Sequence, residues 1–167
     1  MRWRSVVGLG VFVTAVVACA PGSRTGPAER IRSFGPGDAP ITSSGVTAEE
    51  GGWRIQPAGA GSVRLFEVPQ PNGLDGAVLT YRAQMKADNV VGKAYLEMWV
   101  RVPGRGEFFS RGLAQPLTGT SWWASYEIPF FLTEKGVRAD LVKLNVAFDG
   151  GGTVWIKDVE LLKAPLA

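Results

Sequence analysis

Large polar and aromatic side chains occur at alternate positions between residues 82 and 101, and a ligand could bind to them. Arg82 and Gln84 fall on one face of an extended chain, opposite apolar residues. Further on, Glu97, Trp99 and Arg101 share a face in the same way. Side chains alternate across a β-strand with a period of two, so both segments are predicted to be strands with one core-facing side. A tryptophan between a glutamate and an arginine on the other side favours ligand binding.

A third segment, residues 141–150, adds Asn145 to the same pattern, with aliphatic residues at the alternate positions. If its strand shares a sheet with the two strands predicted within residues 77–102, one patch combines an aromatic ring with amide and charged groups. An aromatic face stacks on the C–H groups of a sugar, and planar polar groups hydrogen-bond its hydroxyls. The candidate ligand-binding residues are Arg82, Gln84, Glu97, Trp99, Arg101 and Asn145. The alternative is that Trp99 packs under a loop and that the charges form solvated cross-strand pairs.

The residue types present exclude several kinds of catalytic chemistry. The chain contains no histidine, which excludes histidine-based triads, histidine-ligated metals and histidine acid–base catalysis. Glu97 and Glu127 are mid-strand carboxylates, and a glycosidase needs two carboxylates across a cleft. We expect no catalytic residues and no enzyme activity, although a small glycosidase-like enzyme stays open. No cofactor is expected, apart from a structural calcium ion for which Asp149 or Asp158 could supply ligands.

The N-terminal residues have the composition of an export signal. Arg2 and Arg4 precede the apolar run of residues 6–18, which is too short for a comfortable membrane span. The run ends in Val-Val-Ala before Cys19, the only cysteine, and residues 16–19 resemble the bacterial lipoprotein box. The resemblance implies cleavage before Cys19 and lipidation of that cysteine with acyl chains such as palmitate. The alternatives are an ordinary secretory signal that contains a cysteine and an uncleaved anchor helix.

Three regions are predicted along the chain: a lipoprotein signal peptide over residues 1–18, a lipidated cysteine with a flexible tether over 19–40, and a folded domain over 41–167. The tether is rich in Pro, Gly and Ser and lacks periodicity. Removing Arg2 and Arg4 with the signal leaves 16 basic against 15 acidic side chains, so the net charge is close to zero. This balance gives no electrostatic reason to expect nucleic acid as a partner.

Short alternating segments separated by turn residues account for the rest of the domain. Together with the two strands within 77–102, these segments are residues 41–47, 53–58, 62–68, 107–113, 121–132, 141–150 and 153–163. About nine short strands with turn signals between them are typical of an all-β sandwich or barrel. Trp122 and Trp123 are adjacent in one of them, so we expect one in the core and the other exposed or at a loop rim.

Two motifs in the second half of the chain point to a known group of domains. Residues 120–129 contain Thr, Trp, Tyr and Ile-Pro in a characteristic order, and residues 150–161 read GGGTVWIKDVEL. With these motifs, residues 77–162 resemble the jelly-roll, galactose-binding-like domains found in carbohydrate-binding modules and in bacterial envelope proteins. The resemblance implies a β-sandwich of two antiparallel sheets, a fold that hosts sugar binding, other ligand binding and structural roles. Lys157 stands where that group commonly has an acidic residue, which counts against a calcium site formed by carboxylates near this strand.

These features predict an envelope-anchored lipoprotein whose jelly-roll β-sandwich binds a ligand without catalysis, with carbohydrate as the expected ligand. The alternatives are a structural or protein-interaction module of the cell envelope and, third, a small glycosidase-like enzyme. The expected partners are the membrane, through the lipid anchor, and a carbohydrate or an envelope protein. The domain is expected outside the cytoplasm, and at the outer membrane if the envelope is Gram-negative, because Ala20 rather than Asp follows Cys19.

Overall fold

Strands form where polar and apolar residues alternate, as the pleated backbone requires. The computed structural model describes residues 26–166, so Cys19 and the predicted signal peptide lie outside the described range. Within that range every regular element is a strand, and nothing is an apolar helix of membrane-spanning length. In chain order the strands are β1 (Glu29–Phe34), β2 (Val46–Glu49), β3 (Gly52–Ile55), β4 (Gly61–Pro69), β5 (Ala77–Val102), β6 (Gly106–Arg111), β7 (Leu117–Leu132), β8 (Leu141–Phe148) and β9 (Thr153–Pro165).

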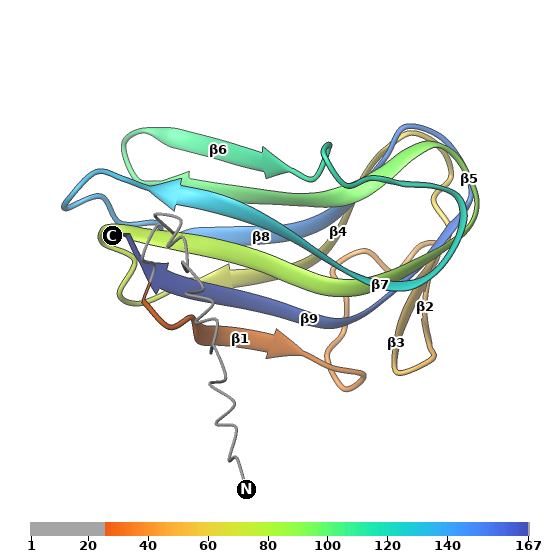
Figure 1. Ribbon diagram of the computed structural model, residues 1–167, viewed down its shortest axis with the longest axis horizontal. Coiled ribbons are helices and arrows are strands. Elements are labelled where there is room, and N and C mark those ends of the chain that lie inside the picture. The colour runs from red at the N-terminus through yellow and green to blue at the C-terminus, as the bar shows by residue number, and fades with distance from the viewer. Residues whose placement is uncertain (1–25, 167) are drawn as a thin grey trace, which may run out of the picture.

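All strand pairs are antiparallel, and they join into one curled sheet that folds over itself into two layers (Figure 1). In the first layer β5 lies between β7 and β9. β1 and β3 both pair with the far edge of β9, and β2 pairs with β3. The second layer follows the order β6–β5–β8–β4. This architecture confirms the predicted jelly-roll β-sandwich of about nine strands.

β5 belongs to both layers, which corrects the prediction of two separate strands within residues 77–102. Residues 77–88 pair with β9 in the first layer, whereas residues 94–102 pair with β8 and β6 in the second. The two halves do not pair with each other. The Asn/Gly connection expected between them is a corner at which one continuous strand passes from the first layer to the second (Figure 1).

The corner of β5 contains residues that tolerate left-handed backbone angles. Asn89 has a φ of 51° and Gly92 a φ of 73°, a region open to glycine and, among other residues, to asparagine. The turn between β8 and β9 lies against this corner, because a Cβ atom on Gly152 would lie 2.5 Å from the Cα atom of Val90. Glycine at that position therefore allows the two backbones to approach closely.

β1 lies inside the segment predicted to be a flexible tether, residues 19–40. That prediction is wrong for residues 29–34, which form β1 and pair with β9. Phe34 is buried, and its ring stacks on that of Phe66 with the centroids 4.1 Å apart. Burial of such a side chain contributes roughly 1.5–3 kcal/mol, which helps to offset the entropy lost when this segment is ordered. The folded domain therefore begins before Ile41.

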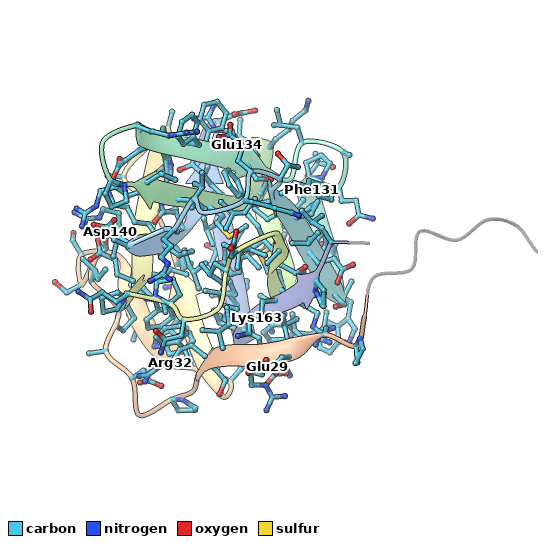
Figure 2. The ribbon with its side chains drawn as sticks, turned by 90° about the vertical axis from the view of Figure 1, so that its left-hand side faces the viewer. Glu29, Arg32, Phe131, Glu134, Asp140 and Lys163 are labelled. Atoms are coloured by element: carbon cyan, nitrogen blue, oxygen red, sulfur yellow. The ribbon has the colours of Figure 1, made fainter. Side chains whose placement is uncertain are left out.

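The two ends of the described chain lie side by side. Glu29, at the start of β1, is opposite Lys163 near the end of β9, and Figure 2 looks at this end of the sandwich. The Lys163 Nζ atom lies 3.4 Å from the Glu29 carboxylate. We call this the terminal end. The corner of β5 and the turn between β8 and β9 lie at the opposite end, the corner end (Figure 1).

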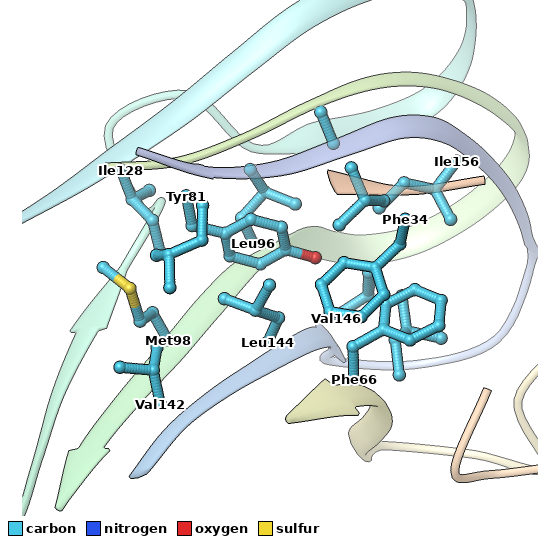
Figure 3. Close-up of a cluster of buried hydrophobic side chains, with 14 of the residues drawn as sticks. Phe34, Phe66, Tyr81, Leu96, Met98, Ile128, Val142, Leu144, Val146 and Ile156 are labelled. Atoms are coloured by element: carbon cyan, nitrogen blue, oxygen red, sulfur yellow. The ribbon is translucent and has the colours of Figure 1, made fainter. Parts of the chain in front are cut away.

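The core fills the space between the two layers with side chains from both of them (Figure 3). Val142, Leu144 and Val146 of β8 are fully buried there, as the alternation predicts. In β4 a bulge turns both Leu65 and Phe66 inward, although strict alternation would place them on opposite faces. The remaining outward positions of the two layers form two separate outer faces.

Candidate functional site

The structure divides the predicted patch between these two outer faces. Glu97, Trp99 and Asn145 lie on the outer face of the second layer, where Glu97 and Asn145 are register partners. Arg82 and Gln84 lie on the outer face of the first layer, because they precede the corner of β5. The prediction of a single patch is therefore wrong for Arg82 and Gln84.

Glu97 is the buried centre of the outer face of the second layer. Its side chain is 1% exposed, and its carboxylate accepts three hydrogen bonds. Ser62 Oγ donates to Oε1 at 2.7 Å, Asn145 Nδ2 donates to Oε1 at 3.2 Å, and Arg111 Nε donates to Oε2 at 2.8 Å. The three donors come from β4, β8 and β6, which lie on both sides of β5 in this layer.

The charge of Glu97 follows from this environment. Burial acts to raise the pKa of the carboxyl group, because desolvation disfavours the anion. The interactions with Ser62, Trp99, Arg111 and Asn145 together outweigh burial, and the pKa of Glu97 lies below its ordinary value of 4.5. Glu97 is therefore an anion at neutral pH, and it fixes the guanidinium group of Arg111 on this face.

An aromatic pair borders this polar row. The ring centroids of Trp99 and Phe109 lie 5.1 Å apart with an angle of 49° between the planes. The guanidinium group of Arg111 lies over the Phe109 ring, 4.4 Å from its centroid. Trp99 is half-buried and Phe109 is 52% exposed, so the pair presents aromatic surface to solvent. Residues 106–111 extend the sheet as β6 beside Trp99 rather than forming a loop above it.

Three residues of this face were not predicted to belong to it: Ser62, Phe109 and Arg111. The alternation along residues 107–111 could have identified Phe109 and Arg111, since the Pro-Gly-Arg-Gly turn predicts a hairpin with the strand that carries Trp99. Ser62 could not be identified in this way, because no sequence pattern places β4 beside β8. Its position depends on the order of strands in the sheet.

Arg101, also predicted on this face, is held by Asp140. Its Nε and Nη2 atoms donate to the two carboxylate oxygens of Asp140 at 2.8 and 3.1 Å. The hydrogen bond raises the pKa of Arg101 and lowers that of Asp140. Both groups are exposed, so this pair adds little to the stability of the fold. Its main effect is to engage the guanidinium group away from the row around Glu97.

The two candidate catalytic carboxylates lie in different layers. Glu127 is exposed on β7 in the first layer, whereas both oxygens of Glu97 are engaged on the second. These two residues do not form the facing pair that a glycosidase requires. Among residues 26–166 no three acidic, histidine or cysteine side chains gather closely enough to hold a metal ion. A calcium ion at Asp149 or Asp158 stays a prediction.

No family model and no curated protein sequence matches this chain, but solved structures share its fold. A family 16 carbohydrate-binding module aligns with a TM-score of 0.52 at 10% identity, over 76% of this chain and 92% of that chain. The CBM22-1 xylan-binding domain from Paenibacillus barcinonensis aligns with a TM-score of 0.53 at 10% identity, over 84% and 97%.

A third similar structure contains the CBM22-1 and GH10 modules of a Clostridium thermocellum endo-1,4-β-D-xylanase, complexed with xylohexaose. It aligns with a TM-score of 0.50 at 12% identity, over 80% of this chain and 25% of that chain. At such identities the similarity establishes the fold, which hosts many functions. The function of this chain therefore depends on the side chains that its own faces carry.

Proposed function

We propose that this protein is a non-catalytic carbohydrate-binding module that binds a glycan on the outer face of its second layer. The observation that carries the proposal is the half-exposed ring of Phe109, tilted against Trp99 beside an arginine that the buried Glu97 holds in place. An aromatic surface and fixed planar hydrogen-bonding groups are what recognition of a sugar ring requires.

Each residue of this face has a separate role in the proposal. Phe109 and Trp99 stack on the C–H face of a sugar. Arg111 binds Glu97 through Nε, which leaves its two terminal nitrogens as donors for ligand hydroxyls. Asn145 holds the carboxylate of Glu97 from the other side, and its buried Oδ1 atom has no hydrogen-bond partner among the described residues. The row is thus pre-organised before a ligand arrives, which lowers the entropic cost of binding.

The similar structures suggest which glycans to test first. One is a xylan-binding domain, and another contains xylohexaose. Since they share only the fold with this chain, xylo-oligosaccharides are a starting point for a wider panel. Gluco-, manno- and galacto-oligosaccharides with β-1,4 linkages complete it, because all of them present alternating C–H faces and hydroxyl edges to an aromatic surface.

Replacement of Phe109 by alanine tests the proposal. Isothermal titration calorimetry against the panel should identify a glycan whose affinity falls about tenfold in Phe109→Ala, because a stacking ring is removed. Phe108→Ala is the matched control, since Phe108 is adjacent on β6, is 44% exposed and points to the opposite side of the strand. The control should bind the glycan as the unmodified protein does, and both variants should keep its Tm within a few degrees.

An equal loss of affinity in both phenylalanine variants would contradict the proposed face. Absence of binding to the whole panel, together with a protein partner captured by mild crosslinking, would favour the second candidate, a protein-interaction module of the cell envelope. One observation favours that candidate: Phe108 and Phe131, 44% and 58% exposed, border a hollow of about 130 Å³ together with Val102 and Val137. Exposed apolar surface of this kind commonly marks contacts between proteins.

We further propose that a lipid on Cys19 anchors the protein to the cell envelope. The support is the sequence around that residue, an arginine-containing start, a short apolar run and a lipoprotein-box pattern. In this arrangement residues 20–28 connect the anchor to β1, and the domain with its glycan-binding face lies outside the cytoplasm.

A further inference from the structure

Lys86 lies among three tryptophans on the outer face of the first layer. Its Nζ atom is 4.6 Å from the ring centroid of Trp155, 5.2 Å from that of Trp122 and 5.3 Å from that of Trp123. The same atom lies 2.7 Å from both carboxylate oxygens of Glu50. The charge of Lys86 is thus neutralised within this group of five residues, which we call the tryptophan cluster.

Strand register explains how the cluster forms. Lys86 of β5 is directly opposite Trp155 of β9, and both point outward. Trp122 and Trp123 come from β7, whose register with β5 shifts after Met85. The shift lets both neighbouring rings approach Lys86, although adjacent strand residues normally face opposite sides. The prediction that one of them belongs to the core is therefore wrong, since Trp123 is half-buried outside the core and Trp122 is 76% exposed.

Two features of this surface are open to a ligand. The first is the indole of Trp122, most of whose area faces solvent. The second is Lys157, whose Nζ atom lies over the ring of Trp123 at 4.2 Å. No carboxylate in the described range lies within ion-pairing distance of Lys157, whereas Lys86 has Glu50. The exposed ring of Trp122 therefore belongs to the chain neighbour of Trp123, and the ammonium group of Lys157, which has no ion-pair partner in the described range, lies over the Trp123 ring.

We propose that the tryptophan cluster and Lys157 form a second glycan-binding site, which takes an acidic glycan. A uronic acid ring stacks on the open surface of Trp122, and its carboxylate pairs with the ammonium group of Lys157. The site lies on the opposite outer face from Phe109, and it does not rest on the function proposed for that face.

The neighbouring positions on the first layer suit the rest of a sugar chain. Gln84 is the register partner of Lys157, and Ser125 is the register partner of Gln84, so an amide and a hydroxyl group continue the row. Gln84 and Ser125 also line a hollow of about 380 Å³. The charged residues around that hollow are two cations and two anions, namely Arg30, Arg82, Asp158 and Glu160. Because these four charges balance, Lys157 supplies the net positive charge of this region.

Charge also argues against two other occupants of the site. A second copy of the chain, docked about a two-fold axis that passes close to Lys157, would bring the two unpaired ammonium groups toward each other. A nucleic acid needs several phosphates neutralised for useful affinity. The chain has 18 Lys and Arg, of which Arg2, Arg4 and Arg24 precede the described range. The other 15 lie within it, as do all 15 Asp and Glu, so the described domain carries no net charge. A single unpaired lysine close to aromatic rings can instead pair with the one carboxylate of a uronic acid unit.

The test uses the purified full chain and two matched probes, hexagalacturonate and the same oligomer with its carboxylates methyl-esterified. Calorimetry should show binding of the acid form that weakens as salt rises, and weaker binding of the ester. Trp122→Ala should lower affinity for the acid form about tenfold, because the stacking surface is removed. Lys157→Gln should lower it about threefold and should leave the affinity for the ester unchanged.

Two variants separate this site from other effects. Phe131→Ala removes another exposed aromatic ring of β7 and should leave affinity for hexagalacturonate unchanged. Trp99→Ala should also leave it unchanged, so that failure of this site and failure of the site around Phe109 are distinguishable. Equal affinity for acid and ester, unchanged binding in Trp122→Ala and Lys157→Gln, or tighter binding of a single-stranded oligonucleotide would overturn the proposal. So would a dimer in sedimentation that Trp122→Ala abolishes.

Discussion

At the residue scale, Glu97 shows how one buried charge organises an outer face of the sandwich. A carboxylate removed from water is costly unless hydrogen bonds replace its hydration, and Glu97 receives three. The main effect of Glu97 in the sheet is therefore to hold neighbouring side chains in position. Chief among them is Arg111, whose side chain would otherwise sample many rotamers over Phe109.

Glu97→Gln should lower the free energy of unfolding at pH 7 by about 2 kcal/mol, because an anion held by three donors becomes a neutral amide. The folded pKa of Glu97 lies below its ordinary value of 4.5. The stabilisation is therefore fully present above about pH 4.5 and is lost as pH falls through the folded pKa. Urea unfolding at pH 7 and at lower pH should show the difference between the two proteins shrinking with acidification.

Glu127→Gln is the matched control for this measurement, since Glu127 is an exposed carboxylate on a neighbouring strand. It should change the unfolding free energy by no more than about 0.5 kcal/mol at either pH. A Glu97→Gln protein as stable as the control at pH 7 would show that the hydrogen bonds around Glu97 contribute nothing net.

At the element scale, the sequence predicts β5 well in one respect and poorly in another. The alternation within residues 77–102 correctly predicts which side chains face the core, because burial of one face is a local property of the pattern. It cannot predict that both halves are one strand, since pairing partners come from segments far away in sequence. This is why the alternation groups Arg82 with Glu97, although the corner separates them. The sequence does not predict β1 for a related reason, since a Pro- and Gly-rich segment can still add a strand to an open edge of β9.

Gly152→Ala tests the role of the corner. A methyl group there would lie 2.5 Å from the Cα atom of Val90 and 2.6 Å from the backbone oxygen of Asn89, and the φ of 114° is strained for alanine. The substitution should lower the free energy of unfolding by more than about 2 kcal/mol. Gly151→Ala is the adjacent control, because nothing lies within 4 Å of its added methyl group. Equal stability of both variants in urea unfolding would contradict the close approach at the corner.

At the scale of the whole molecule, a two-layer sandwich offers two outer faces with different chemistry. One combines Phe109 and Trp99 with a neutralised polar row, and the other combines three tryptophans with an unpaired lysine. Composition predicted neither, because the total charge of the chain is close to balance. The order of the strands decides which charged residues share a face, and composition does not contain that order.

The proposed lipid anchor concerns the whole molecule, and Cys19→Ser tests it. The unmodified protein should fractionate with membranes and carry the additional mass of a lipid on its N-terminal cysteine, since acyl chains supply the membrane affinity. The variant should lose that mass and appear in the soluble or periplasmic fraction. Membrane fractionation that persists in Cys19→Ser would contradict lipidation as the means of attachment.

The side-by-side position of the two chain ends has a mechanical consequence. Because β1 runs antiparallel to β9 with Glu29 opposite Lys163, tension between the ends acts across the strands and loads one pair of hydrogen-bonded residues at a time. β1 then separates from β9 one residue pair after another, starting at the terminal end. The contact between Phe34 and Phe66 is lost last. In the proposed arrangement, a glycan held on an outer face and a lipid on Cys19 would pull the domain and the N-terminal end of β1 apart. We therefore expect β1 to detach before the strands that form the two outer faces.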